Sequence, residues 1–306
     1  LLASGIEFLE QRTGIPVLGV VPHFSHFRIP EEDSVALERR RNEARAARSE
    51  DKKIRIGVIR FPRISNYTDF DALEAEPDID LHYIEGGHEL NGLDCLILPG
   101  SKATISDLAF LERHGFFPAI RDFAWPVVGI CGGYQMLGSR VVDPDGMESP
   151  VPEAEGLGLL DAETILLATK ETHQAEARLL AAAGLAAPGC GTTVSGYEIH
   201  MGSTTLGPSA KPFAQLLLRS GREVAVPDGA VSPDGRVFGT YLHGIFDNHE
   251  FRTAFLNRLR REKGLPLLSA DDRADDPLDL LAEHLERHLD MERLLRICGI
   301  EWASSQ

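Results

Sequence analysis

The stretch PVVGICGGYQMLG, residues 126–138, decides the fold of this chain. Its apolar first half, Val127–Ile130, predicts a short buried strand, and residues 134–137 have helix-forming content. Cys131 lies between them, close to three glycines. Small residues around one reactive side chain are typical of a sharp strand-to-helix turn that exposes a nucleophile at the carboxyl end of the strand. The amides that begin the following helix favour the thiolate form of the cysteine.

Cys131 has a second interpretation, because free cysteine is among the residue types most often buried. A structural cysteine in a glycine-rich corner also fits this stretch. A catalytic cysteine needs a base, and an intracellular cysteine with a distant histidine is a candidate nucleophile pair. Of the 11 histidines, His243 is the first candidate, since it ends an apolar strand and precedes a glycine. His200 also ends a predicted strand and is the second candidate.

The sequence predicts no metal site. His284 and His288 lie four residues apart on the last predicted helix, a spacing that two metal ligands can use. No third ligand accompanies them, and the polar face of an amphipathic helix explains both. The four cysteines lack CxxC spacing, so neither a zinc site nor a disulfide framework is expected. Free thiols fit a reducing, cytoplasmic compartment.

The composition is that of a water-soluble globular protein. The 306 residues are 43% hydrophobic and 25% charged, which predicts about two domains. No apolar run approaches the ~20 residues of a membrane span, so we expect no membrane partner. The net charge of −16 also argues against binding to nucleic acid or to an anionic membrane.

The first 53 residues predict two different segments. Residues 1–24 combine a helix over Ile6–Gln11 with an apolar strand over Ile15–Val21. Such a small αβ unit cannot form a core by itself, so we expect its packing partners outside this segment. Residues 25–53 are predicted to be a linker, with a charged and solvated helix that begins at Glu31.

Short apolar strands alternate with helices from Ile54 onward. This pattern predicts an α/β fold with a mostly parallel central sheet and helices on both faces. Binding sites in such sheets collect beyond the carboxyl ends of the strands, where Gly100 and Cys131 are both expected. The predicted strands are Ile54–Ile59, Asp80–Ile84, Cys95–Leu98 and Val127–Ile130, with one helix beginning at Asp69 and another over Thr104–Arg113.

Glycine-rich strands are predicted after residue 151, interrupted by one helix over Lys170–Ala183. Two helices end the chain, and the second is capped by Asp276 with Pro277 at its first position. The strands predicted in this part are Leu157–Leu160, Thr193–Met201, Glu223–Val226 and Val237–Leu242, and the first of the two final helices is Glu250–Lys263.

Backbone amides near Cys131 are candidate donors to a developing oxyanion. The amide of Gly132 follows the cysteine, and those of Gly100 and Ser101 lie at the end of the neighbouring strand. Together they would form a hole with two donors. The alternative for residues 99–101 is an ordinary turn from strand to helix. The G-x-x-x-x-G-K-[ST] spacing of a phosphate loop is absent from the sequence, so no ATP site is predicted in these residues.

Two motifs resemble the class I glutamine amidotransferases of the CobB/CobQ type. They are GICGGYQMLG at residues 129–138 and YLHGIFD at residues 241–247. Three further motifs narrow the resemblance to the cobyric acid synthases. These are EEDSVAL at 31–37, LPGSK at 98–102 and GYEIHMG at 196–202. The resemblance covers essentially the whole chain.

The resemblance implies a flavodoxin-like amidotransferase domain within a two-part enzyme. Residues 1–24 resemble the end of an ATP-dependent, P-loop-like synthetase domain, residues 25–53 a linker, residues 54–250 the amidotransferase domain, and residues 251–306 a helical tail. L-glutamine would supply ammonia. ATP and Mg²⁺ would serve the synthetase half, which amidates the b, d, e and g carboxylates of adenosylcobyrinic acid a,c-diamide, and no cofactor is expected in this fragment.

The resemblance also implies roles for individual residues. Cys131 would be the nucleophile and His243 the base and acid, while Gln135 would join Gly100, Ser101 and Gly132 in binding the oxyanion or substrate. Many class I enzymes have a glutamate two residues after the histidine, where this chain has Ile245. The group that orients His243 is therefore open. Glu198, Asp247 and a backbone carbonyl are candidates, and His200 is a possible secondary site residue.

Two positions depart from the family pattern. Ser203 stands where arginine is expected, and Ala103 where asparagine is more usual. Neither is predicted to be catalytic. Two alternative functions stay open at this point. One is a sister enzyme, either cobyrinic acid a,c-diamide synthase or a cell-wall amidotransferase. The other is a binding module that kept the fold and lost the reaction.

Overall fold

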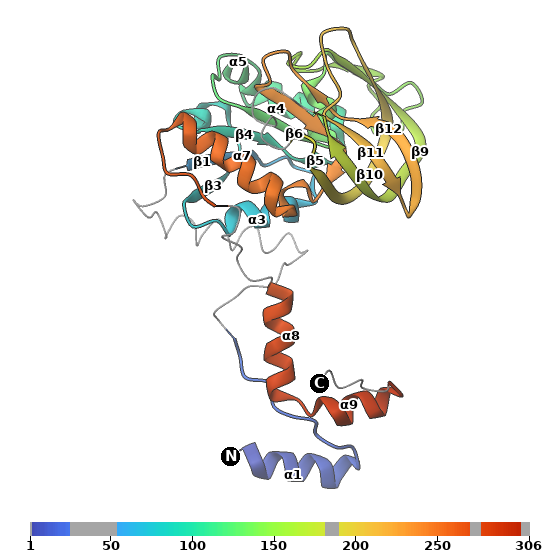
Figure 1. Ribbon diagram of the computed structural model, residues 1–306. Helices are drawn as coiled ribbons and strands as arrows, with labels where there is room; N and C mark the ends of the chain where they lie inside the picture. The colour runs from blue at the N-terminus through green and yellow to red at the C-terminus, as the bar shows by residue number, and fades with distance from the viewer. Residues whose placement is uncertain (1, 25–53, 181–189, 270–276, 301–306) are drawn as a thin grey trace. The chain divides into compact units, whose positions relative to one another are not determined.

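The computed structural model describes residues 2–24, 54–180, 190–269 and 277–300 (Figure 1). The chain forms two compact units. One consists of Leu1–Pro30 with Arg273–Gln306, and the other of Glu31–Asp272. The predicted linker, residues 25–53, lies outside the described residues, as does the predicted cap Asp276.

The larger unit is built on a six-stranded sheet with the order β13-β14-β6-β4-β1-β3. All neighbouring pairs are parallel except β13 with β14. The inner strands β4, β6 and β14 are buried along their whole length, as their apolar sequences require in a sheet covered on both faces. The strands are β1 (Ile54–Ile59), β3 (Ile79–Ile84), β4 (Cys95–Leu98), β6 (Val127–Ile130), β13 (Ala230–Val231) and β14 (Val237–Thr240).

Helices cover both faces of this sheet (Figure 1). Successive side chains of a strand point to opposite faces, so Ile97 packs into one core and Leu96 and Leu98 into the other. The first core contains residues from α3 (Asp71–Glu74) and α7 (His249–Glu262). The second contains residues from α4 (Thr104–Arg113), α5 (Phe116–Arg121) and α6 (Gly132–Leu137). The predicted parallel sheet with helices on both faces is therefore confirmed.

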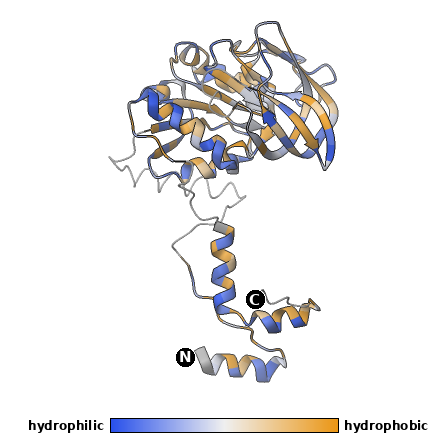
Figure 2. Ribbon diagram, viewed as in Figure 1, coloured by the Kyte–Doolittle hydropathy of each residue, from blue (hydrophilic) through white to orange (hydrophobic). Residues whose placement is uncertain are grey.

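A second, mostly antiparallel sheet has the order β12-β11-β9-β10-β15, with β7 and β8 attached at one side. Its inward side chains, including Ala177 and Leu216, join the first core. Figure 2 shows hydrophobic and hydrophilic residues along these strands. The strands are β7 (Arg140–Val142), β8 (Glu153–Glu155), β9 (Ala162–Leu179), β10 (Thr193–Leu206), β11 (Ala214–Arg219), β12 (Arg222–Asp228) and β15 (Leu242–His243).

The predicted helix over Lys170–Ala183 is wrong, because residues up to Leu179 belong to strand β9. The segment is rich in Ala and Glu, which favour helix, but local propensity is only a weak predictor. Its buried residues alternate with exposed ones at Ala175, Ala177 and Leu179, and β9 pairs with both β10 and β11. Pairing on both sides thus outweighs the local propensity. Residues 181–183 lie outside the described part.

The predicted strand over Leu157–Leu160 is also wrong. The segment is a loop whose amides bind the end of α6. Leu157 donates to the carbonyl of Met136 at 2.8 Å, and Leu160 to that of Leu137 at 2.9 Å. The last carbonyls of a helix have no partner within the helix, so this apolar loop satisfies them instead of pairing as a strand.

The smaller unit contains α1 (Leu2–Thr13), α8 (Pro277–His288) and α9 (Met291–Cys298). The predicted strand over Ile15–Val21 is not formed. Among the described residues of this unit, the segment makes a single β-bridge, between Gly19 and Leu289. Next to this bridge, the Asp290 amide donates to the Leu18 carbonyl at 2.7 Å. None of the side chains described here is buried.

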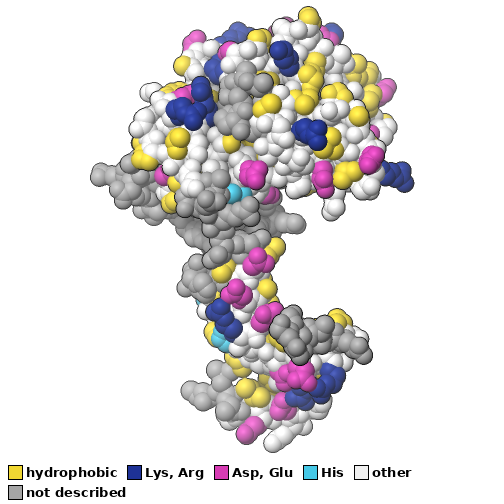
Figure 3. Space-filling view, in the orientation of Figure 1, with side chains coloured by type: hydrophobic (Ala, Val, Ile, Leu, Met, Phe, Trp, Pro, Cys, Tyr) yellow, Lys and Arg dark blue, Asp and Glu magenta, His cyan; other side chains and the backbone are white. Residues whose placement is uncertain are grey.

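The predicted tail, residues 251–306, is divided between the two units. Helix α7 packs into the first core through Phe251, Phe255 and Leu259, whereas α8 and α9 belong to the smaller unit. None of the helices in the described residues is both long and apolar enough to cross a membrane. Basic and acidic side chains are interspersed over the face of the larger unit in Figure 3.

Replacement of Phe255 by alanine should destabilise the larger unit strongly. Its side chain is fully buried and contacts Phe246 with ring centroids 5.1 Å apart. A cavity at such a site costs about 3–5 kcal/mol in the free energy of unfolding, measured by denaturant titration. The matched control is Leu267→Ala, whose side chain is 50% exposed and should change stability by about 0.5 kcal/mol or less. Equal losses in the two variants would contradict the predicted core.

Candidate active site

Cys131 occupies a strained turn between β6 and α6. Its φ of 51° and ψ of −112° are rare for a residue with a side chain and cost about 1–3 kcal/mol. Two backbone bonds hold the turn: the Cys131 amide donates to Thr240 at 2.8 Å, and its carbonyl accepts from Gln135 at 3.1 Å. Gly133 is required because a Cβ there would lie 2.0 Å from the carbonyl oxygen of Leu98. The sharp turn that the sequence predicts is present.

The sheet brings His243 to the same edge as Cys131. Strand β14 lies beside β6, with Thr240 opposite Ile130, so the chain that leaves each strand emerges at the same carboxyl edge. His243 is fully buried. Gly100 also lies against it, because a Cβ on this glycine would be 3.2 Å from Cε1 of the imidazole. The thiol of Cys131 is 6% exposed and donates to the carbonyl of Ile199 at 3.6 Å.

The imidazole of His243 is held by Asp69, which lies in the turn η1 (Tyr67–Phe70). Nδ1 of His243 is 2.7 Å from Oδ2 of Asp69, and the other carboxylate oxygen accepts the amide of Gly244 at 2.9 Å. Burial opposes a charge on the ring, but the bond to Asp69 and the neighbouring Cys131 outweigh burial and raise the pKa of His243 to about 10. Nε2 is buried and has no hydrogen-bond partner among the described residues.

None of the groups predicted to orient His243 hydrogen bonds to its imidazole in the described residues. Glu198 forms a two-pronged pair with Arg219, at 2.7 and 2.9 Å. Burial would raise the pKa of Glu198, but the nearby imidazole of His200 and the bonds from Arg219 hold it below its ordinary value. Asp247 is exposed as a residue, but its carboxylate is partly desolvated by neighbouring atoms. This desolvation and the carboxylate of Asp69 raise the pKa of Asp247 to about 6. The orienting group is therefore Asp69, and neither Glu198, Asp247 nor a carbonyl takes that position.

The sequence does not predict Asp69 as the partner of His243, because it precedes the histidine by 174 residues and resembles an ordinary helix start. One feature of the sequence nevertheless indicates that Asp69 lies near the site. Asp69 follows the loop after β1, and the carboxyl ends of parallel strands meet at one edge of the sheet. Ile245, which stands where many class I enzymes have glutamate, is fully buried in the first core. The side chain of Ile245 has no polar atom that could hydrogen bond to the imidazole.

Of the three predicted oxyanion donors, the amide of Gly100 points toward strand β2 (Ile64–Ser65), whereas those of Ser101 and Gly132 are available. Strand β2 and strand β5 (Gly100–Ser101) are antiparallel. The Lys102 amide donates to Arg63 at 3.1 Å, and amides alternate in direction along such a ladder, so the Ser101 amide points away from β2. Gly132 begins α6, where amides lack an acceptor within the helix. A Cβ on Gly132 would lie 3.0 Å from the Ser101 nitrogen, so Gly132 lies directly against Ser101.

Two predicted polar side chains are committed to structural bonds. The hydroxyl of Ser101 donates to Asp107 and accepts the amide of Ala103 at 2.9 Å. Gln135 is 3% exposed and donates from Nε2 to the Met201 carbonyl at 2.9 Å. Its Oε1 accepts the hydroxyl of Thr104 at 3.0 Å. The Gln135 carboxamide thus braces α6 against β10 and α4, and its predicted role in binding substrate stays a prediction.

His200 lies outside the Cys131–His243 pair. Its ring stacks on Tyr241, with centroids 3.7 Å apart, and its Nε2 is 3.7 Å from Oε1 of Glu198. Ser203 is exposed on β10 after a bulge, and Ala103 is buried at the start of α4. The departures at these two positions touch neither Cys131 nor His243 in any bond described here.

His284 and His288 belong to the smaller unit, with ring centroids 4.6 Å apart. Within the residues that the structure describes, no group of three or more potential metal ligands occurs. Nε2 of His284 instead donates to the carbonyl of Pro22 at 2.9 Å.

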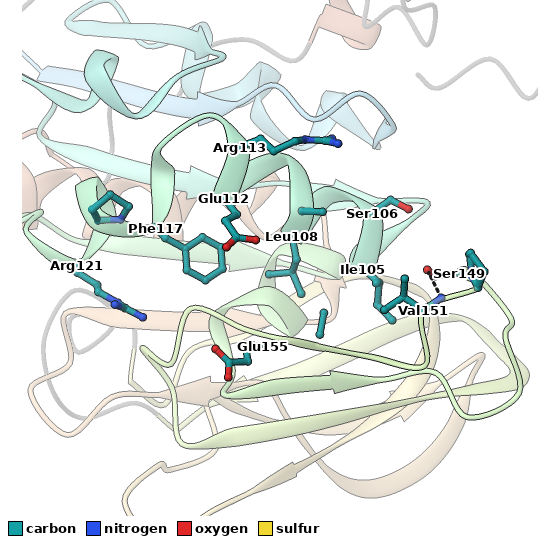
Figure 4. A pocket seen from close by; sticks show the side chains of 14 residues that line it. Ile105, Ser106, Leu108, Glu112, Arg113, Phe117, Arg121, Ser149, Val151 and Glu155 are labelled. Atoms are coloured by element: carbon teal, nitrogen blue, oxygen red, sulfur yellow. Dashed lines mark hydrogen bonds between the residues drawn. The ribbon is translucent and has the colours of Figure 1, made fainter.

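An open groove of about 920 Å³ lies between α4, α5 and residues 149–155 (Figure 4). Its lining mixes apolar side chains such as Leu108 and Phe117 with Arg113, Arg121 and Glu155. None of the predicted site residues lines it. The groove is therefore separate from the Cys131–His243 arrangement.

Comparison with known proteins identifies the family of the larger unit. Residues 55–251 match the family model of the CobB/CobQ-like glutamine amidotransferase domain. The chain belongs to this family. The described CobB/CobQ-like unit therefore carries the predicted amidotransferase fold. The predicted P-loop-like fragment before it stays a prediction.

Curated relatives of this CobB/CobQ-like chain are named cobyric acid synthase. The protein from Syntrophobacter fumaroxidans is 46% identical over 309 residues, which cover 98% of this chain and 60% of the relative. The protein from Desulforamulus reducens is 44% identical, with 98% of this chain and 59% of the relative covered. The chain thus spans about 60% of the length of these relatives.

A solved structure shares the fold at low sequence identity. The structure of PurLQS from Thermotoga maritima is 17% identical, with a TM-score of 0.50 over 68% of this chain and 99% of that one. This likeness bears on the fold alone.

Replacement of Asp69 by asparagine should lower the pKa of the His243 imidazole. The negative charge favours the protonated ring, so its removal lets the ring lose its proton at a lower pH. NMR titration of the ring signals would measure the shift. The control Asp80→Asn removes a carboxylate that pairs with His82 at 2.9 Å and should leave His243 unchanged. An unaltered His243 titration in Asp69→Asn would contradict the assigned pair.

Proposed function

We propose that this chain is the glutamine-hydrolysing part of a cobyric acid synthase in cobalamin biosynthesis. It would supply ammonia for ATP-dependent amidation of the b, d, e and g carboxylates of adenosylcobyrinic acid a,c-diamide. The observation that carries the proposal is the strained turn at Cys131, set beside a buried His243–Asp69 pair. The names of the relatives favour this substrate over that of the a,c-diamide synthase. The intact Cys131 and His243 favour an enzyme over an inactive binding module.

The first step of the proposed reaction forms a thioester. Nε2 of His243 holds the proton that comes from the Cys131 thiol, since the raised pKa of the imidazole favours its charged form, and the sulfur attacks the side-chain amide carbon of glutamine. The imidazole carries a second proton on Nδ1, which donates to Asp69. Nε2 is therefore the nitrogen that exchanges a proton with the thiol. The charge that develops on the amide oxygen is stabilised by the amides of Ser101 and Gly132.

The second step releases ammonia and then glutamate. The imidazolium of His243 protonates the leaving nitrogen as the carbon–nitrogen bond breaks, which leaves a γ-glutamyl thioester on Cys131. Water then attacks the thioester carbon and gives a proton to His243. The carbon–sulfur bond breaks, and the thiol recovers its proton. Each turnover consumes one glutamine and one water and yields one glutamate and one ammonia.

The ammonia has to reach the synthetase half without mixing with bulk water, where it would be protonated and lose its nucleophilic lone pair. ATP and Mg²⁺ belong to that half in this proposal. A cytoplasmic location accompanies it, supported by free thiols at Cys95, Cys131, Cys190 and Cys298.

Replacement of Cys131 by alanine should abolish glutamine hydrolysis, because no other group described at the turn can form the thioester. In the full-length enzyme with its synthetase half, amidation with added ammonia should persist. The measurements are glutamate release and ATP-dependent amidation with each nitrogen source. Cys190→Ala removes an exposed thiol and serves as the matched control. Glutamine-dependent amidation that survives in Cys131→Ala would refute the assigned nucleophile.

A substrate panel tests the corrinoid assignment separately. The full-length enzyme, given glutamine, ATP and Mg²⁺, should convert adenosylcobyrinic acid a,c-diamide into a product with four new amides, detected by mass spectrometry. Amidation of the a and c carboxylates of cobyrinic acid instead would identify the sister synthase.

A further inference from the structure

The imidazole of His243 is covered by the ring of Tyr197. The two residues are direct partners in the pairing of β10 with β15. Their rings are stacked, with centroids 5.1 Å apart and planes inclined by 16°. Tyr197 is partly exposed, whereas His243 has no exposed surface. The phenol ring therefore separates one face of the imidazole from solvent.

The hydroxyl of Tyr197 is bound by the turn that carries Asp69. Nδ2 of Asn66 donates to it at 2.7 Å, and the carbonyl of Asn66 accepts the amide of Asp69 at 3.1 Å. Asn66 has the left-handed backbone conformation, with φ 54° and ψ 44°, which asparagine adopts more readily than most residues. The side chain of Tyr197 thus stacks directly on His243. It is linked to Asp69 indirectly, through Asn66.

Stacking and hydrogen bonding restrain the imidazole in different directions. The bond from Nδ1 to Asp69 lies in the ring plane and leaves the ring free to tilt about it. An aromatic ring against one face blocks that tilt and does not cover Nε2, which lies at the ring edge. Small errors in the position of a catalytic group cost large factors in rate, so restraint in both directions matters for proton transfer.

An ordinary packing role predicts something different from this arrangement. A ring that only fills space needs no hydroxyl, and phenylalanine would serve equally well. Burial, together with the carboxylates of Asp69 and Asp247 and the side chain of Cys131, raises the pKa of Tyr197. The phenol therefore stays neutral at ordinary pH and adds no charge beside the His243–Asp69 pair.

We propose that Tyr197 is a positioning residue, which clamps the imidazole of His243 and, through Asn66, holds the turn that presents Asp69. The rate effect of this clamp rests on the proposed glutaminase function. The orientation of the imidazole does not, and it can be observed separately.

The test compares Tyr197→Leu, Tyr197→Phe and Asn66→Gly in the full chain. Tyr197→Leu removes the stack and should lower kcat for glutamine hydrolysis about tenfold, with KM nearly unchanged, since an aromatic pair contributes on this scale. It should also shift the alkaline limb of the pH profile. Water that reaches the ring changes both effects that set the pKa of His243, namely the burial that opposes its charge and the attraction of Asp69.

The remaining variants isolate the hydroxyl. Tyr197→Phe keeps the stack and should lower kcat about fivefold, the effect of one neutral hydrogen bond. Asn66→Gly tolerates the same backbone conformation and removes only the donor. The double variant should be no slower than either single one, because both changes remove the same bond. Asn257→Ala, which breaks a 2.9 Å bond to Leu268 away from His243, is the matched control.

Two results would overturn the clamp. One is a Tyr197→Leu protein that loses thermal stability but keeps the kcat and pH profile of the parent. The other is independent losses in Tyr197→Phe and Asn66→Gly that multiply in the double variant. If the parent chain has no glutaminase activity, the NMR signal of the Nδ1 proton of His243 still tests the orientation of the imidazole. A changed signal in Tyr197→Leu would support the clamp while the proposed function fails, and an unchanged signal would refute the clamp.

Discussion

The site depends on one buried ion-pairing contact, between Asp69 and His243. The two side chains are 2% and 0% exposed, and charged groups so far from water cost several kcal/mol unless they are paired and hydrogen bonded. Both carboxylate oxygens meet this condition, at 2.7 Å from Nδ1 and 2.9 Å from the Gly244 amide. The same two bonds join the turn η1 to the end of β15. The position of the imidazole therefore follows from the position of η1.

The larger unit holds these segments by packing. Phe70 at the end of η1 shares the first core with Phe246 and Phe251, which follow His243 in the chain. Cys131 is placed by a different constraint, the close approach of α6 to the end of β4 at Gly133. Core packing thus fixes the base, and backbone contact fixes the nucleophile. Their meeting at one edge results from the parallel order of β6 and β14.

The sequence predicts the parts of this site that depend on local pattern. The glycines and apolar run around Cys131 predict the turn, and the strand that ends at His243 predicts a residue at the sheet edge. Asp69 depends on a contact between segments 174 residues apart, for which no local pattern exists. The same limit explains Lys170, where helix-forming composition hides a strand that is specified by its neighbours β10 and β11. Gln135 was placed by resemblance, and its buried bonds give it a structural position.

The second sheet is part of the site and not an addition to it. Strand β10 brings the Tyr197 ring to His243, the Ile199 carbonyl to the Cys131 thiol and the Met201 carbonyl to Gln135. A parallel sheet edge alone would leave the imidazole open to water on one face, where its attraction to Asp69 would be weakened. An aromatic cover excludes that water without placing another charge near the pair. Because it blocks the face of the ring and not its edge, Nε2 stays free to exchange a proton.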